Sequence, residues 1–109
     1  MAASRLDNLL RSAIAERRVV TFMLDGMQRV AEPHDYGLID REPRLFFYQI
    51  GGKSRSGRPF GWRWAKPVSR ITQLNVLDRH FAGPRPAPTG QHVKWDALFA
   101  SVSRRDDET

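Results

Sequence analysis

Hydrophobic residues near the start of the chain recur with the period of an α-helix. They occupy the i, i+3, i+4, i+7 and i+8 positions of one apolar stripe. Ser4 followed by Asp7 resembles a capping box, and Arg17 and Arg18 add positive charge where the helix dipole favours it. The pattern predicts a helix over residues 4–18. Its apolar stripe consists of Leu6, Leu9, Leu10, Ala13 and Ile14.

The pattern changes from period 3.6 to period 2 at residue 19. Residues 19–24 are rich in β-branched and aromatic side chains that alternate, with Val20, Phe22 and Leu24 on one face. Asp25-Gly26 is typical of a two-residue type I′ hairpin turn, which requires positive φ at both positions. A returning strand is therefore expected over residues 27–31, with Val30 inward and Arg29 outward.

The middle of the chain reads as a series of short strands separated by turn residues. Pro33 is expected to interrupt the second strand, since proline lacks the amide that a strand ladder needs. The most apolar run, residues 45–50, is the expected central strand. The other expected elements are a resumed strand at 36–39, a turn at 40–43, a flexible loop at 51–59, and strands at 60–64 and 69–78, split near Pro67. Such strands after one helix indicate a small curled sheet or barrel.

The C-terminal part has a different composition. The barrel with its helix is expected over residues 4–82, followed by a linker rich in proline and glycine over residues 83–92. An amphipathic helix is predicted over residues 93–105. Such a helix needs a cover, and two arrangements stay open: exchange with a second copy in a homodimer, which is favoured, or folding back on the same barrel. The residues of its apolar, interacting face are Trp95, Leu98, Phe99 and Val102.

Composition limits the classes of function. The 109 residues carry a formal charge of +6, which favours contact with phosphates or acidic surfaces, and contain no cysteine, which excludes disulfides and thiolate chemistry. The three histidines have no metal-ligand spacing, so we expect no metal and no cofactor. No apolar run approaches the roughly 20 residues of a membrane span, and the start resembles no signal peptide. We expect a cytoplasmic protein that does not insert into a membrane.

No motif for catalysis is evident, so we expect a protein that is not an enzyme. Ser54 and Ser56 have no histidine near them in sequence that could activate them. The loop GGKSRSG lacks the upstream glycine and the following helix of a phosphate-binding P-loop. Glu32 and Asp35 flank a predicted turn, where a structural role is the simpler interpretation.

Binding chemistry is better represented than catalysis. Arg29, Tyr36, Tyr48 and Arg63 could share one face of the sheet, and guanidinium forks with aromatic rings suit phosphates and bases. Trp62 and Trp64 alternate with Phe60, which favours core packing for the two tryptophans and a water-facing Arg63. A second group, of possible polyanion contacts, lies at the loop tip and comprises Lys53, Arg55 and Arg58.

The order of several short motifs resembles the WYL domain, in particular its short bacterial versions. The segments that carry the resemblance run from about Leu9 to Pro86. They are AIAERRVVTF, the Asp-Gly hairpin, RVAEP, Pro33 to Gly37, Tyr48 to Gly57, Gly61-Trp62-Arg63, RITQLNVLD and Phe81 to Pro86.

The resemblance implies an SH3-like or Sm-like β-barrel that binds a ligand within bacterial transcription regulation. It also implies that basic and aromatic residues of the sheet form the site. We therefore expect a non-catalytic module for a nucleotide or nucleic acid, and the alternative is a protein-interaction module or homo-oligomeric scaffold that uses the C-terminal helix. The ligand-binding positions that the resemblance implies are Arg29, His34, Tyr36, Tyr48 and Arg63.

Overall fold

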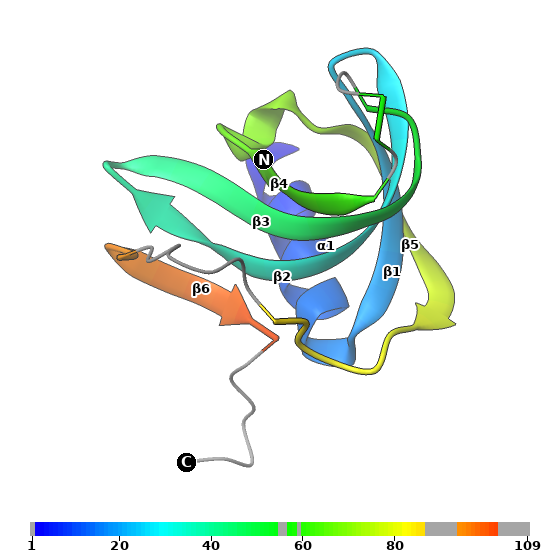
Figure 1. Cartoon of the computed structure of the whole chain (residues 1–109). Helices are drawn as coiled ribbons and strands as arrows, with labels where there is room; N and C mark the ends of the chain where they lie inside the picture. Colours follow the sequence, from blue (N-terminus) through cyan, green and yellow to red (C-terminus); the bar gives the residue numbers. More distant parts are fainter. Residues whose placement is uncertain (1, 55–56, 59, 87–93, 103–109) are drawn as a thin grey trace.

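One bent antiparallel sheet packs its inner face against an N-terminal helix (Figure 1). The computed structural model describes residues 2–54, 57–58, 60–86 and 94–102. The helix α1 spans Ala2–Glu16, and a short 3₁₀ helix, η1, spans Val68–Arg70. The strands are β1 (Arg18–Leu24), β2 (Met27–Ile39), β3 (Glu42–Gly52), β4 (Gly61–Ala65), β5 (Thr72–His80) and β6 (Ala97–Ser101). The expectation of a mainly β fold that begins with a helix is confirmed.

The sheet is not closed into a barrel, contrary to the expectation. Its order is β4-β3-β2-β1-β5, with β6 paired to β2 outside this path. Between the two end strands of the described sheet the chain runs through Lys66, Pro67 and η1, and η1 contacts β3 and β4 instead of extending the ladder. The sheet therefore curves without joining β4 to β5 (Figure 1).

The predicted helix is confirmed, with its boundaries moved toward the N-terminus. Leu10, Ala13 and Ile14 of the apolar stripe are buried. Arg17 ends the helix in the left-handed region at φ 55°, so Arg17 and Arg18 lie beyond it. The predicted capping role of the Ser4 side chain lies outside the described residues. No helix in the described part of the chain has the length and apolar character needed to cross a membrane.

The first hairpin forms at the predicted turn but reverses the expected facing of Arg29. Asp25 and Gly26 have φ 55° and 74°, as a type I′ turn requires. The turn sets a register in which Phe22 lies opposite Arg29. Residues directly opposite in an antiparallel pair share a face, and Phe22 belongs to the core. Arg29 is consequently turned inward and is 3% exposed, so the outward prediction is wrong.

The core fills the concave inner face of the sheet. Phe22 and Phe47 meet edge to face with ring centroids 5.1 Å apart. Leu45 and Ala65 extend the same face, and Leu10 of α1 packs into it. The predicted strand at residues 45–50 is part of β3, but the centre of the sheet is β2, because β3 lies one place closer to the edge strand β4.

Pro33 does not break β2, although a break was expected. The strand continues through it for 13 residues. Pairing with β1 ends at Ala31 and pairing with β6 begins at Asp35, so Pro33 lies where the strand passes from one partner to the next. An irregularity in the register with β3 occurs at the same place. Proline is tolerated at this position because few ladder hydrogen bonds along the edge of β2 that faces β1 and β6 require its missing amide.

The predicted C-terminal helix is absent, and residues 97–101 form strand β6. This strand pairs antiparallel with the second half of β2, for example Tyr36 with Ala100. The half of β2 beyond Ala31 would otherwise expose an edge of backbone amides and carbonyls after β1 has diverged. Satisfying this edge outweighs the helical spacing of four apolar residues, because so short an apolar run is ambiguous between helix and strand.

The residues of that expected helix face therefore have other contacts. The segment folds back on its own chain, and it does so as a strand instead of a helix. Val102 is buried in the core, Phe99 lies against Tyr36, and Trp95 lies against Trp64 at 5.7 Å between ring centroids. Residues 87–92 of the predicted linker, and residues 93 and 103–105 of the predicted helix, lie outside the described residues.

We expect Gly37→Ala to destabilise the protein through the β2–β6 contact. A Cβ at Gly37 would lie 2.3 Å from the Ala97 carbonyl oxygen and 2.9 Å from Cε3 of Trp95. Because a backbone atom limits the space, relief requires β6 to move, and we expect a loss of about 1–3 kcal/mol, the cost typical of overpacking. Urea denaturation followed by tryptophan fluorescence measures this loss.

The matched control is Gly51→Ala on β3. A Cβ there would meet Val30 at an ordinary 3.5 Å. This variant should change the unfolding free energy less than Gly37→Ala. Equal effects of the two substitutions would contradict the close approach of β6 to β2.

Candidate functional site

The structure divides the five predicted ligand-binding residues among three places. Arg29 and Arg63 lie on the inner face of the sheet, opposite Phe22 and Phe47 respectively. His34 and Tyr48 contact Trp62 on the outer face. Tyr36 is buried against α1 and β6. The predicted single face carrying Arg29, Tyr36, Tyr48 and Arg63 is therefore not formed.

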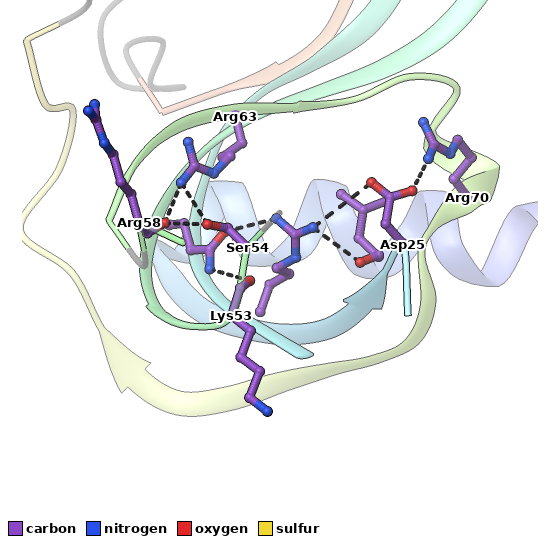
Figure 2. Close-up of polar contacts among 9 residues, drawn as sticks. Asp25, Lys53, Ser54, Arg58, Arg63 and Arg70 are labelled. Atoms are coloured by element: carbon purple, nitrogen blue, oxygen red, sulfur yellow. Dashed lines mark hydrogen bonds and ion pairs between the residues drawn. The ribbon is translucent and has the colours of Figure 1, made fainter. Parts of the chain in front are cut away.

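A group of cations surrounds Asp25 and the β3–β4 loop, and we call it the cationic end (Figure 2). Its core is Arg29, whose Nη1 donates to Oε1 of Gln49 at 3.1 Å and whose Nη2 donates to the Leu24 carbonyl at 3.2 Å. Gln49 is fully buried and donates in turn to the carbonyls of Gly51 and Lys53. Arg29 thus reaches the loop through Gln49. The members of the cationic end are Arg29, Lys53, Arg58, Arg63 and Arg70, together with Asp25.

Arg63 connects the inner face to the same loop. Its Nη2 donates to Oγ of Ser54 and to the carbonyl of Arg58. Phe47, its cross-strand partner, is in the core, so Arg63 is not on a separate water-facing side as predicted. Arg63 is half-buried, and the two hydrogen bonds of its Nη2 hold the loop in the position that Figure 2 shows.

Positive charge at the cationic end exceeds negative charge. The ion pairs within this group use one carboxylate, that of Asp25, which pairs with Arg70 and lies 3.9 Å from Nη2 of Arg29. Burial lowers the pKa of Arg29, and the neighbouring Arg63 lowers it further. Within the described residues, the Nε atoms of both arginines are buried without a hydrogen-bond partner. The two guanidinium groups therefore repel each other in a partly desolvated place.

The predicted loop contacts are partly described. Lys53 and Arg58 have exposed side chains at the cationic end. Arg55 lies outside the described residues. The main-chain amide of Lys53 donates to the Gln28 carbonyl at 2.9 Å, which holds the start of the loop against β2.

Tyr36 has a structural role, because it connects β2 to α1. Its hydroxyl donates to Oδ1 of Asp7 on α1 at 2.7 Å, and the residue is 4% exposed. Burial and this hydrogen bond raise the pKa of Tyr36. The contact connects the helix to β2. A ligand of the cationic end would not reach it, because Tyr36 lies seven residues further along the strand, roughly 20 Å at the rise of a strand.

The outer face of the sheet carries an aromatic cluster. Trp62 stacks on Phe46 at 4.5 Å and meets the edges or faces of His34 and Tyr48. Trp64 also lies against Phe46. Trp62 and Trp64 are half-buried on this face and are not part of the main core, which corrects the predicted packing of both.

A segment that sequence analysis assigned to the end of the barrel and the linker covers this cluster. Residues 81–86, which we call the strap, cross the outer face. Arg85 makes a bidentate ion pair with Glu32, in which Nε donates to Oε1 at 2.6 Å and Nη2 donates to Oε2 at 3.1 Å. Its guanidinium lies 4.2 Å from the ring centroid of Tyr48. The strap and Glu32 were missed as partners because they are 53 residues apart. The available signal was the presence of both RVAEP, which contains Glu32, and the segment Phe81 to Pro86 in the same family resemblance.

His34 connects the strap to β2 through both ring nitrogens. Nδ1 lies 2.8 Å from the Glu32 carbonyl oxygen, and the Arg85 amide donates to Nε2 at 3.2 Å. A carbonyl only accepts and an amide N–H only donates, so the ring is neutral with its proton on Nδ1. Phe81 stacks on the same ring at 5.6 Å. Protonation would direct a second N–H at the Arg85 amide.

Comparison with known proteins adds no assignment. The sequence matches no protein-family model, and no curated protein and no solved structure shows detectable similarity to it. Within the described residues, no three histidine, aspartate or glutamate side chains gather as metal ligands would. The resemblance to the WYL domain therefore stays a prediction.

We expect acid to destabilise the protein through His34. Burial is the main influence and lowers the pKa of His34 below its usual 6.5, Arg85 lowers it too, and Glu32 and Asp35 oppose the shift. As the pH falls through about 6.5 the unfolded chain takes up the proton first, so stability is lost between that pH and the lower pKa of the folded state. Urea denaturation at about pH 7.5 and about pH 5.5 measures the loss.

His34→Gln removes this titration, so its unfolding free energy should vary less with pH than that of the wild type. His80→Gln, at an exposed position of β5, is the control and should retain the wild-type dependence. A His34→Gln variant with an unchanged pH dependence would show that His34 is not the titrating group.

Proposed function

We propose that this chain is a non-catalytic binding module for a phosphorylated ligand, either a nucleotide or a nucleic acid, with a regulatory role that includes transcription. The observation that carries the proposal is the convergence of Arg29 and Arg63 at the cationic end with one carboxylate between five cations. A phosphate would supply the negative charge that these guanidinium groups lack.

The two arginines have different roles in this proposal. Both terminal nitrogens of Arg29 already donate hydrogen bonds within the protein, and its side chain is almost fully buried. Arg29 therefore acts through its charge, which raises the local potential in a medium that screens poorly. It also holds Gln49, and through it the loop, in place.

Arg63 is the better direct ligand. It is half-buried at the base of the loop that carries Lys53 and Arg58, and its guanidinium already makes contact with loop oxygens. A phosphate at this end would meet the arginine fork of Arg63. The exposed side chains of Lys53 and Arg58 extend away from Arg63 in different directions and add to the positive potential around it (Figure 2). Such contacts neutralise phosphate without reading a base, so this site supports binding without sequence preference.

The alternative that used a C-terminal helix as the interacting element loses its basis, because that segment is a strand within the sheet. Protein interaction through another surface is argued separately below.

We expect Arg63→Gln to weaken binding of single-stranded DNA or RNA about tenfold at low salt, the loss typical of one charge-assisted phosphate contact. The salt dependence of the affinity should also become shallower, because fewer counterions are released. Fluorescence anisotropy with labelled oligonucleotides and nucleotides, at low salt and at about 0.15 M, measures both quantities.

Arg79→Gln is the matched control. It removes the same charge from an exposed position near the C-terminal end of β5. This end is far from the Asp25 turn, because the first residue of β5, Thr72, is the one that pairs with Met23. This variant should bind nearly as the wild type does. Saturable binding that responds equally to both substitutions would reflect net charge alone and would reject the cationic end as the site.

A further inference from the structure

The strap occupies a site whose walls belong to the sheet. Glu32 lies on β2, Tyr48 on β3 and Trp62 on β4, three neighbouring strands held in register. The strap itself belongs to none of the described strands, and its residues Arg85 and Pro86 contact all three of these side chains. The walls are therefore preorganised and the occupant is a segment of irregular structure.

The side chain of Arg85 is held as a specific ligand would be. Its fork pairs with both carboxylate oxygens of Glu32, which is 8% exposed, and its plane lies over the ring of Tyr48. A carboxylate with so little contact with water needs a cation, and the planar guanidinium satisfies both its oxygens while it stacks on the ring. This combination selects arginine over lysine.

The main chain of the strap is also held by hydrogen bonds at two points. The Arg85 amide donates to Nε2 of His34, and Nε1 of Trp62 donates to the Pro86 carbonyl at 3.2 Å. Pro84 and Pro86 flank the arginine, and proline fixes its own φ and restricts the residue before it to extended conformations. Proline-rich segments are generally recognised by aromatic surfaces of this kind, and here Glu32 adds an acidic partner for the arginine.

We propose that the outer face is a recognition site for a proline-flanked arginine in an extended segment of a partner protein, and that the strap occupies this site in cis. When the strap leaves, an arginine of the partner pairs with Glu32 and stacks on Tyr48. The proline-flanked backbone of the partner then meets His34 and Trp62.

Partial exposure of the strap favours its replacement by a segment of the partner. The side chain of Arg85 remains 43% exposed, and Ala82, Pro84 and Pro86 are exposed as well. Replacement of one arginine by another returns every interaction of Glu32 and Tyr48. The competitor has to overcome the tether and the contacts at the start of the strap, where Arg17 bonds to the main chain of Phe81 and Ala82. A short tether corresponds to an effective concentration on the order of millimolar, which sets the affinity that a partner must exceed.

The test uses the full chain with Arg85→Ala and a peptide of the strap sequence, Phe-Ala-Gly-Pro-Arg-Pro, as the probe. The readout is the indole N–H resonance of Trp62, which reports its hydrogen bond to the carbonyl of the second proline. We expect Arg85→Ala to bind the peptide saturably, at least about tenfold more tightly than the wild type, in which the tethered strap competes.

Two controls separate recognition from general attraction of cations. The same peptide with lysine in place of arginine should bind at least about tenfold more weakly, because it loses the fork and the stacking. Glu32→Gln combined with Arg85→Ala should abolish the response. Arg85→Lys, which keeps a cation beside Glu32, should have an intermediate affinity and serves if Arg85→Ala fails to fold.

The proposal is overturned if the Trp62 resonance of a folded variant does not respond to the peptide, or if the arginine and lysine peptides bind equally. Equal affinity of the wild type and the Arg85 variants would likewise show that the strap does not occupy this site. None of these results bears on the cationic end, which lies on the inner face and is tested with phosphorylated ligands.

Discussion

The architecture depends on the unequal lengths of β1 and β2. The first strand has seven residues and the second has 13, so the hairpin leaves the second half of β2 with an edge that β1 does not cover. Backbone groups in that position need partners, and β6 supplies them. Because β6 comes from the C-terminal part, the chain must return to β2 from the end of β5. The strap is the first described part of this return, and its path brings Arg85 to Glu32.

The hairpin also determines the chemistry of the two faces. A type I′ turn at Asp25-Gly26 places Arg29 opposite Phe22, and consecutive residues of a strand point to opposite faces. On β3 the same alternation separates the two candidate sites at adjacent residues. Gln49 holds Arg29 on the inner face, and Tyr48 lies under Arg85 on the outer face. One short stretch of sheet thus carries both proposed sites, one for an anion and one for a guanidinium group.

Local patterns predicted the elements that local forces decide. The apolar stripe of α1, the hairpin turn and the approximate strands after it follow from periodicity and from φ requirements. The inward position of Arg29 was also available, since a two-residue turn after Leu24 pairs Leu24 with Met27 and Phe22 with Arg29. The outward prediction for Arg29 followed from an alternation with Val30 inward, whereas the register of the two-residue turn decides which face each residue takes. Arginine at a core-facing position is rare, and here Gln49 and the Leu24 carbonyl make it possible.

Features that depend on distant partners were not accessible in the same way. Trp95, Leu98, Phe99 and Val102 satisfy a helical spacing, and only the uncovered edge of β2 makes a strand of them. The Glu32–Arg85 pair likewise joins residues whose local signals suggest a turn and a linker. These two misassignments have one origin, because the docking of β6 and the path of the strap are parts of the same return of the chain. A strand at residues 97–101 that pairs with β2 requires the chain to return to β2 after β5, and the first described part of that return brings Arg85 to Glu32.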